Sequence, residues 1–368
     1  MEEDIIKELG DRNLELIGNK NHALPGNNGP YNDKDIPVRN TAHWLITYIY
    51  LYKKYKDKKY LNIVNKFSEY LMQDELYGCD GIIKIRNNRD TDYTNGLIGE
   101  AWVIEALIAA AFFFNDDKYY EKALKIFEAE PFDEKIKLWK IKDLDGTCNT
   151  IDYVYNHQLW FAAAGSKIID YKYNSTIDKH IRAFLNNYKN NLGIQPSGML
   201  FHQVNYQYTY KAKLSLIVKC ILCDLGIGKR WKAQKELEEG YETFDFYGFA
   251  LLYNKYKECK IFQSSRFKRA LNYCLNKDRV KKLYIENNYI NKYAYPYNSP
   301  AFEYQFISMT FRGYIDENLN NELLNNQIKI TYSSNGILQN NNNDALTLTA
   351  RIYELTRYYD ILNNKGGI

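Results

Sequence analysis

Apolar residues recur at helical spacing along nearly the whole chain. The spacing predicts helices over 42–55 and 60–72, separated only by Lys56-Asp57-Lys58-Lys59. The same pair returns over 96–114 with 119–129, 151–170 with 177–188, 206–225 with 231–241, 244–256 with 266–276, and 301–315 with 319–327. Single helices are predicted over 4–17 and 345–362. Because short Asp, Asn and Lys connections cap helices and turn the chain, we expect the paired helices to be antiparallel.

Short extended elements are predicted after several of these pairs. Their common sign is a glycine or turn residue followed by apolar residues. They lie at 80–83, 137–139, 198–201, 282–284 and 336–338. No segment has the alternation of strand and long helix that a Rossmann fold or a TIM barrel requires. No Pro-, Gly- or Ser-rich linker divides the chain, so residues 1–368 are expected to form a single domain.

Repeated amphipathic pairs must stack on one another, because one pair alone cannot bury its apolar face. The helices over 97–114 and 151–164 are apolar nearly all round, which indicates burial on both sides. We therefore expect an all-α fold, a closed (α/α)6 toroid of helix hairpins with short β elements in the loops. An open solenoid is the alternative, and the terminal helices leave open whether six or seven hairpins close the ring.

Composition and charge exclude several classes of protein. Hydrophobic residues make up 45% of the chain and charged residues 26%, which is enough for a folded core. A net charge of +4 is too small to indicate a nucleic-acid-binding protein. The longest apolar run, 102–114, is too short to span a bilayer, and the acidic start Met1-Glu2-Glu3-Asp4 is unlike a signal peptide. We expect a cytoplasmic protein with no membrane span, and six scattered cysteines agree with this.

Polar residues that precede the inner helices are the candidates for chemistry. In a ring of hairpins these loops meet at one mouth, and loops on a rigid scaffold tend to carry function. The catalytic candidates are Asp92, His157, His202 and Glu303. The substrate-binding candidates are Arg39, His43, Asn95, Glu100, Asp152, Asn156 and Trp160. Each also has a structural explanation, as a helix cap, a packed core residue or a solvated charge.

Particular residue types suggest particular roles. Arg39 is suited to bind a carboxylate, and Asp92 is the candidate proton donor for glycosyl transfer. Asp152 and His157 are close enough in sequence to lie near one another where a helix begins, with Trp160 one turn further on. A P-loop, a dinucleotide-binding motif and a zincin motif are all missing from the sequence. No cofactor and no metal are expected, and the oligomeric state stays open.

Several segments resemble the six-hairpin (α/α)6 glycosidase superfamily, which includes unsaturated uronyl hydrolases and N-acylglucosamine 2-epimerase-like isomerases. The first is Thr94-Asn95-Gly96-Leu97-Ile98-Gly99-Glu100-Ala101-Trp102, followed by Asn115-Asp116-Asp117-Lys118-Tyr119. The segments 156–164, 198–202 and 298–303 resemble uncharacterised relatives encoded in archaeal N-glycosylation (Agl) gene clusters. The resemblance covers roughly residues 38–362. In the uronyl hydrolases a key Asp lies just before the helix that Gly96 opens, where this chain has Asn95.

Three functions follow from the resemblance and the candidate residues. The first is a carbohydrate-active enzyme, like a glycoside hydrolase, acting on an acidic or amino-sugar-containing glycan at the mouth. The second is a sugar epimerase or isomerase, in which His157 and His202 would move a proton. The third is a non-catalytic glycan-binding scaffold. The hydrolase is placed first by analogy, because the hydrolase branch of this fold is large. In each case the expected partner is a glycan or a small sugar.

Overall fold

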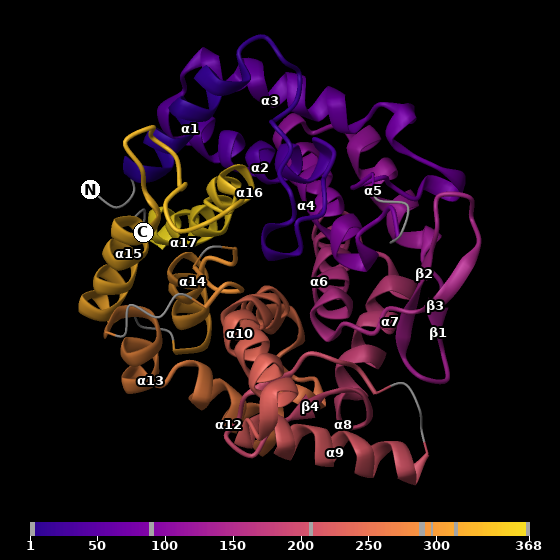
Figure 1. The fold of residues 1–368 in the computed structure, drawn as a ribbon. Helices are drawn as coiled ribbons and strands as arrows, with labels where there is room; N and C mark the ends of the chain where they lie inside the picture. The colour runs from indigo at the N-terminus through magenta and orange to yellow at the C-terminus, as the bar shows by residue number, and fades with distance from the viewer. Residues whose placement is uncertain are drawn as a thin grey trace.

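Six long helices stand side by side and form the inner wall of a ring in the described part of the chain (Figure 1). This structure is a computed structural model, and it describes residues 4–87, 92–205, 209–286, 291–295, 297–312 and 316–365. The inner helices are α2 (Val38–Tyr55), α4 (Gly96–Phe114), α6 (Tyr155–Tyr171), α10 (Gly228–Tyr256), α14 (Pro300–Arg312) and α17 (Tyr353–Lys365). Each packs against the next, and α17 packs against α2, so the ring is closed.

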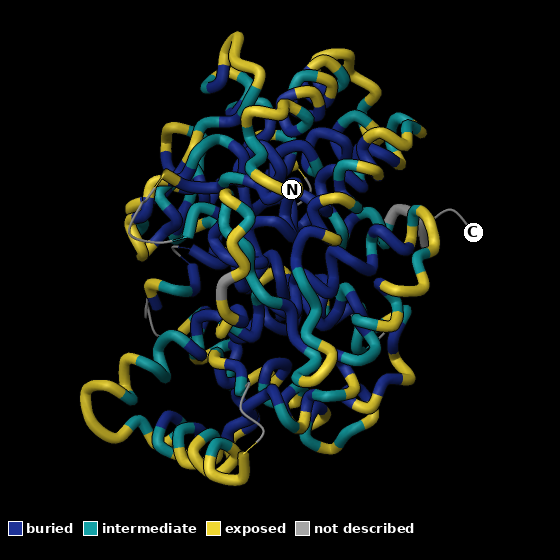
Figure 2. The backbone as a smooth tube through the Cα atoms, turned by 90° about the vertical axis from the view of Figure 1, so that its right-hand side faces the viewer, coloured by how far each residue is buried: buried dark blue, intermediate teal, exposed yellow. Residues whose placement is uncertain are grey.

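A second layer of helices packs on the outside of this wall. Its members are α1 (Asp4–Ile17), α3 (Lys58–Leu71), α5 (Asp117–Ala129), α7 (Ser175–Asn186), α12 (Ser265–Cys274) and α15 (Glu317–Thr331). Both α1 and α3 contact α2. Of the others, α5 contacts α4, α7 contacts α6, α12 contacts α10, and α15 contacts α14. These outer helices are amphipathic, whereas α4 buries nearly every residue from Gly96 to Ala111. Figure 2 shows the buried residues gathered in the middle of the molecule. The predicted (α/α)6 toroid is confirmed.

The turns within the hairpins are held by the residues that the sequence places there. Asp57, Asp116 and Asn174 are the N-cap residues of α3, α5 and α7. Each side chain accepts a hydrogen bond from the backbone N–H two residues further on. A capping side chain satisfies a helix-end donor that has no partner inside the helix, which explains why each outer helix begins where it does.

Short strands occupy the loops between hairpins. One antiparallel sheet has the order β1 (Phe132–Asp133), β2 (Leu138–Lys142) and β3 (Cys148–Ile151), with Phe132 opposite Trp139 and Lys140 opposite Ile151. A second pairs β4 (Gly193–Ile194) with β5 (Leu200–Phe201). The remaining helices are α8 (Tyr188–Asn191), α9 (Tyr210–Leu225), α11 (Lys260–Gln263), α13 (Lys277–Lys281) and α16 (Ala345–Ala350). By length and composition α4 is apolar enough to cross a membrane, but 78% of that stretch is buried inside the protein, as expected for a core helix.

One predicted hairpin was wrong. The ranges 231–241 and 244–256, predicted as helices of two different hairpins, are one continuous helix, α10. Gly240 lies within this helix, and the position requires glycine because a Cβ atom there would come within 2.5 Å of the Cβ of Tyr293. This region therefore contributes one helix, α10, to the inner wall, and α9 packs on α10 outside the ring.

Three further local predictions need correction. The range 345–362 is two helices, α16 and α17, and between them the backbone bonds tighten: the Ile352 N–H donates to the Thr349 carbonyl and the Glu354 N–H to the Arg351 carbonyl. The range 282–284 continues α13 as a π-helical turn, since a short apolar run cannot distinguish a strand from a helical turn. The ranges 80–83 and 336–338 contain only single bridges, at Ile83 and Leu338. Residues 206–208 and 313–315, predicted to be helical, lie outside the described residues.

Candidate active site

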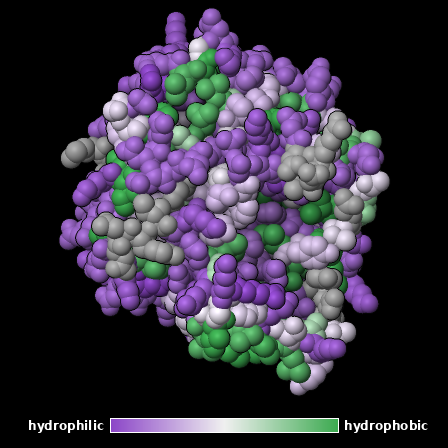
Figure 3. All heavy atoms as spheres, in the orientation of Figure 1, coloured by the Kyte–Doolittle hydropathy of each residue, from purple (hydrophilic) through white to green (hydrophobic). Residues whose placement is uncertain are grey.

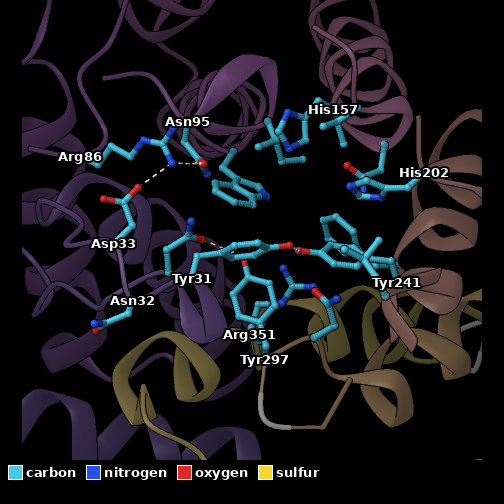
Figure 4. A pocket seen from close by; sticks show the side chains of 18 residues that line it. Tyr31, Asn32, Asp33, Arg86, Asn95, His157, His202, Tyr241, Tyr297 and Arg351 are labelled. Atoms are coloured by element: carbon cyan, nitrogen blue, oxygen red, sulfur yellow. Dashed lines mark hydrogen bonds and ion pairs between the residues drawn. The ribbon is translucent and has the colours of Figure 1, made fainter. Parts of the chain in front are cut away.

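A cavity of about 510 Å³ lies at the end of the ring where several inner helices begin (Figure 4). This volume is within the ~300–1,000 Å³ range of small-molecule sites. We call it the central cavity. Its described lining residues are Asn28, Tyr31, Asn32, Asp33, Arg86, Asn95, Ile98, Trp102, Val154, Asn156, His157, His202, Leu237, Tyr241, Phe244, Tyr297, Asn298 and Arg351.

Helix beginnings surround much of the central cavity. Asn95 and Val154 are the N-cap residues of α4 and α6, and both line it. Asn298 lies just before α14, and Arg351 lies just before α17. Helix N-termini carry a partial positive charge, and here carboxylates offset part of it. The Gly96 N–H donates to Asp92, and the Leu97 and Val154 N–H groups donate to Asp152.

A carboxylate and an imidazole form the most clearly organised pair at the cavity. His157 Nδ1 lies 2.8 Å from Asp152 Oδ2, and the same carboxylate accepts hydrogen bonds from the Leu97 and Val154 N–H groups. Burial tends to raise the pKa of Asp152, but His157 and the backbone donors bring it below its usual value. An ionised carboxylate only accepts, so Nδ1 carries the proton. In the neutral ring, Nε2 is then left with a free lone pair.

The backbone beside this pair must be glycine. Gly96 has a φ of +63°, and a Cβ atom there would lie 2.5 Å from Asp152 Oδ2 and 2.7 Å from His157 Nδ1. Neither distance is compatible with a real side chain. The glycine that opens α4 therefore lets the first turn of this helix sit against the pair.

A second imidazole faces the same cavity (Figure 4). The ring of His202 is tilted against the ring of Tyr241, with 5.0 Å between their centroids. Desolvation, with a smaller contribution from His157, lowers the pKa of His202 to about 3. The ring is therefore neutral at physiological pH and has one N–H donor and one acceptor nitrogen. Its Nδ1 has no hydrogen-bond partner among the described residues.

Arg86 ties the loop before α4 to the N-terminal part of the chain. Its guanidinium donates to Asp33 at 2.7 Å, to Asn95 Oδ1 at 3.0 Å and to the Asp92 carboxylate at 2.9 Å. Asp92 also accepts from the Gly96 N–H at 2.7 Å, so it serves as a cap for the beginning of α4. Both Asp92 oxygens are thus engaged in holding the loop.

The loop between α1 and α2 closes one side of the cavity. Tyr31 and Tyr241 bring their hydroxyl oxygens within 2.9 Å of each other, as Figure 4 shows. Tyr297 donates to Asn28 Oδ1 at 2.8 Å, and the Arg39 guanidinium donates to the same atom at 2.7 Å. The Tyr31–Tyr241 and Tyr297–Asn28 contacts join residues that are more than two hundred positions apart in the sequence. The flat faces and polar tips of tyrosines suit the packing of sugar rings.

Arg351 lies on the other side of the cavity in a closed network. Its guanidinium contacts Glu303 at 2.8 Å and Glu354 at 2.6 Å, and it lies over the Phe244 ring at 4.6 Å. All three charged side chains are almost completely buried. A buried charge must be paired, and here one cation is held between two carboxylates. The network forms part of the cavity wall, and its Arg351 guanidinium faces the cavity with its charge partly neutralised by the two glutamates.

The structure brings some of the predicted site residues to the cavity and not others. Asn95, Asn156, His157 and His202 line it. Asp152, Asp92 and Arg39 lie directly behind residues that do: Asp152 holds His157, Asp92 holds Arg86, and Arg39 holds Asn28 and lies 4.6 Å over the Trp102 ring.

Four other predicted residues lie away from the cavity lining. His43 is stacked on Tyr353 in the core, and desolvation lowers its pKa well below the usual value. Trp160 is buried, with its indole N–H directed to the Phe244 carbonyl. Glu303 lies behind Arg351. Glu100 is buried, and burial, together with Glu130, raises its pKa well above the usual value. Helical spacing could not separate these core positions from cavity positions because the inner helices are buried on every side.

Several lining residues were not among the predicted site residues. They come mainly from the loop before α2, from α10 and from the approach to α14 and α17: Tyr31, Asp33, Tyr241, Tyr297 and Arg351. One sequence signal was available, because the connection from 18 to 37 is long for a compact domain, and such loops tend to be functional. The α10 residues had no signal, because the predicted break at 242–243 placed them in the wrong helix.

Among the described residues, no group of three or more His, Cys, Asp and Glu side chains is placed to hold a metal ion. His157 and His202 share the cavity, but the one carboxylate among its described lining residues is Asp33, which is paired with Arg86.

Comparison with known proteins agrees with the fold. No family model matches the chain. Archaeal glycosylation protein Q from Haloferax volcanii is 28% identical over 368 residues, covering 97% of each chain. The cellobiose 2-epimerase of Bacillus thermoamylovorans superposes with a TM-score of 0.67 at 11% identity, covering 98% of this chain and 99% of that one. An unsaturated glucuronyl hydrolase specific for heparin gives 0.63 at 10%, covering 99% and 98%.

The predicted resemblance is therefore confirmed. The chain has the six-hairpin fold of sugar epimerases and uronyl hydrolases, and it is similar along its length to an archaeal glycosylation protein. At these low identities the solved structures establish the architecture, and the reaction must be argued from the cavity itself.

Proposed function

We propose that this protein is a carbohydrate-active enzyme of the epimerase or isomerase kind, in which imidazoles move a proton on a sugar. One observation carries the proposal: two histidines line the central cavity, whereas the one carboxylate among its described lining residues is paired with an arginine. Most glycoside hydrolases use two available carboxyl groups, one to protonate the leaving oxygen and one to act as base or nucleophile. Asp92 and Glu303, the predicted carboxylates, are both engaged in other contacts.

The proposed reaction begins with His157. Its Nε2 lone pair removes the proton from the carbon next to the carbonyl group of an open-chain sugar. The electron pair of that C–H bond forms a C=C bond, and the π electrons of the carbonyl group move onto its oxygen. Asp152 steadies the imidazolium that forms. His202, neutral and facing the same cavity, stabilises the enediolate by donating a hydrogen bond to its oxygen, and the His157 imidazolium returns the proton to carbon. Return of a proton to the same carbon from the opposite side gives an epimer, and return to the neighbouring carbon gives an isomer.

The binding surface fits a sugar ring. Five aromatic side chains line the cavity: Tyr31, Trp102, Tyr241, Phe244 and Tyr297. Amide and guanidinium groups of Asn95, Asn156 and Arg351 supply hydrogen-bond donors toward hydroxyl or carboxylate oxygens. Two arginines, Arg86 and Arg351, line the cavity with one carboxylate, Asp33, so we propose an acidic or amino sugar as the first class to examine.

The proposal is tested by incubating the full chain in D2O with a panel of neutral, amino and uronic sugars and with the corresponding disaccharides. Proton transfer predicts deuterium on the carbon next to the carbonyl, together with a new epimer or ketose and no new reducing ends. Release of reducing ends without carbon-bound deuterium would overturn the proposal in favour of the hydrolase. Binding of a sugar with neither signal would favour the non-catalytic scaffold.

We also propose that the protein works in the cytoplasm. Cys79 is exposed and free, and Cys220, Cys223, Cys259 and Cys274 are free and buried. Exposed free thiols are typical of reducing compartments. A membrane-impermeant thiol reagent should label Cys79 only after cells are lysed. Labelling in intact cells would place the protein outside the cytoplasm.

A further inference from the structure

Most large apolar side chains of α9 face solvent, whereas those of a core helix face the protein interior. Seven of the eleven large hydrophobic side chains that are exposed in the described chain lie between Tyr210 and Ile227, each 41–79% exposed. They are Tyr210, Leu214, Ile217, Val218, Ile221, Leu225 and Ile227. They include every exposed Leu, Ile and Val of the described residues. We call this surface the α9 face.

The side of α9 that meets the body is small. Only Cys220 and Cys223 of this helix are buried, and together with Phe201 they form a cluster separate from the main core. In Figure 2 this region projects at the bottom of the molecule and is mostly exposed, and Figure 3 shows a hydrophobic patch over it. A contiguous exposed patch of this kind indicates an interaction site.

The charges around the α9 face indicate what binds there. From Thr209 to Lys235 the chain has seven basic residues and one acidic residue, Asp224, whereas the whole chain has a net charge of only +4. The seven are Lys211, Lys213, Lys219, Lys229, Arg230, Lys232 and Lys235. A second copy of the chain would bring lysine against lysine across this surface, which is unfavourable. An anionic partner with an apolar interior is complementary to it.

A basic groove lies beside the apolar residues. A hollow of about 270 Å³ separates α9 from the body, and Ile217 and Ile221 of the α9 face form part of its lining. Lys189, Lys213, Arg266 and Arg269 also line it, and no Asp or Glu is among its described lining residues. Such a groove can accept a phosphate group while the neighbouring side chains enter an apolar layer.

We propose that the α9 face binds the surface of a bilayer containing anionic phospholipids. The apolar residues would enter the boundary between headgroups and acyl chains, as an interfacial amphipathic helix does. The flanking lysines and arginines would contact lipid phosphates, and the groove would hold one headgroup. This inference is independent of the reaction in the central cavity, since no residue of the α9 face lines that cavity.

The test is flotation of the full chain with vesicles of phosphatidylglycerol and phosphatidylcholine, compared with vesicles of phosphatidylcholine alone. We expect binding to the anionic vesicles that weakens as salt is raised. The variant Leu214→Asn/Val218→Asn/Leu225→Asn should lose binding at least about tenfold. The variant Lys229→Gln/Arg230→Gln/Lys232→Gln should lose about 10²-fold, since each basic residue near the surface contributes about fivefold.

A matched control is Tyr173→Asn, because Tyr173 is 70% exposed but lies outside the α9 face. It should float like the unchanged protein. Circular dichroism should show all variants folded, since the replaced side chains are exposed. Three results would overturn the proposal: no flotation with anionic vesicles, undiminished flotation of the apolar variant, or a lipid-free dimer that the apolar variant converts to a monomer. The last would make the α9 face a self-association surface.

Discussion

Two buried clusters of charged and ionisable groups lie on opposite sides of the central cavity (Figure 4), and they differ in what they leave free. In the first, Asp152 uses its oxygens on His157 and on backbone N–H groups, while His157 Nε2 has no described partner. In the second, Arg351 is held between Glu303 and Glu354. A buried polar pair is suited to chemistry only where one partner keeps an unused atom at the cavity. The first cluster meets this condition and the second is suited to support the wall.

The largest effect expected from this difference is on turnover. Replacing His157 by Asn removes the proposed base and should lower kcat by about 10²–10⁴-fold, with the unfolding midpoint little changed, because the ring of His157 is partly exposed. Asp92→Asn is the contrast, since Asp92 holds the loop before α4, and it should retain most activity. The measurement is the rate of carbon-bound deuterium uptake. A reversed ranking, with Asp92→Asn inactive, would favour the hydrolase.

The second cluster should instead determine stability. Arg351→Met leaves Glu303 and Glu354 buried without their cation, and breaking a buried pair in this way costs about 3–5 kcal/mol. Denaturant unfolding measures this free energy directly. Arg182→Met is a control, because its ion pairs with Asp178 and Glu258 are partly exposed and should contribute little. Equal losses in the two variants would contradict the closed-network description.

A smaller, mixed effect is expected at the glycine that adjoins the first cluster. Gly96→Ala places a methyl group against Asp152 and His157 and should reduce turnover at least about tenfold, because misplaced catalytic groups lose rate steeply. Its left-handed backbone should also cost about 1–2 kcal/mol of stability. Gly18→Ala is the matched control: Gly18 has a φ of +55° with nothing within 4 Å. It should lose similar stability and no activity.

The smallest effect concerns a buried carboxyl that belongs to neither cluster. Burial raises the pKa of Glu238 to about 8, and this group has no cation partner among the contacts described for it. A raised pKa means that its contribution to stability is present at low pH and is lost as pH rises from about 4.5 through 8. Thermal unfolding midpoints should therefore fall toward pH 9, and Glu238→Gln should flatten this decline by a few degrees. An unchanged slope would show that Glu238 does not titrate in this range.

Only some residues of the site could be predicted from the sequence. His157 and Asp152 are five residues apart, so their contact follows from local helix geometry, and His202 was recognised by its position after a short strand. The partners that complete the cavity, Tyr31 and Tyr241, are far apart in sequence and meet only through ring closure. Conversely, His43 and Glu100 looked like mouth residues but are buried in the wall, because the same spacing serves both environments.

The sequence by itself determined most of the helix hairpins and favoured a closed ring over an open solenoid, because helical periodicity, capping residues and all-round apolar helices are local properties of the chain. The tertiary structure alone decided which polar residues face the cavity, that α10 is one helix, and that α9 lies outside the ring with its apolar face exposed. These features depend on contacts between segments that are distant in the chain. Such contacts follow from how the repeats pack, and no local pattern specifies them.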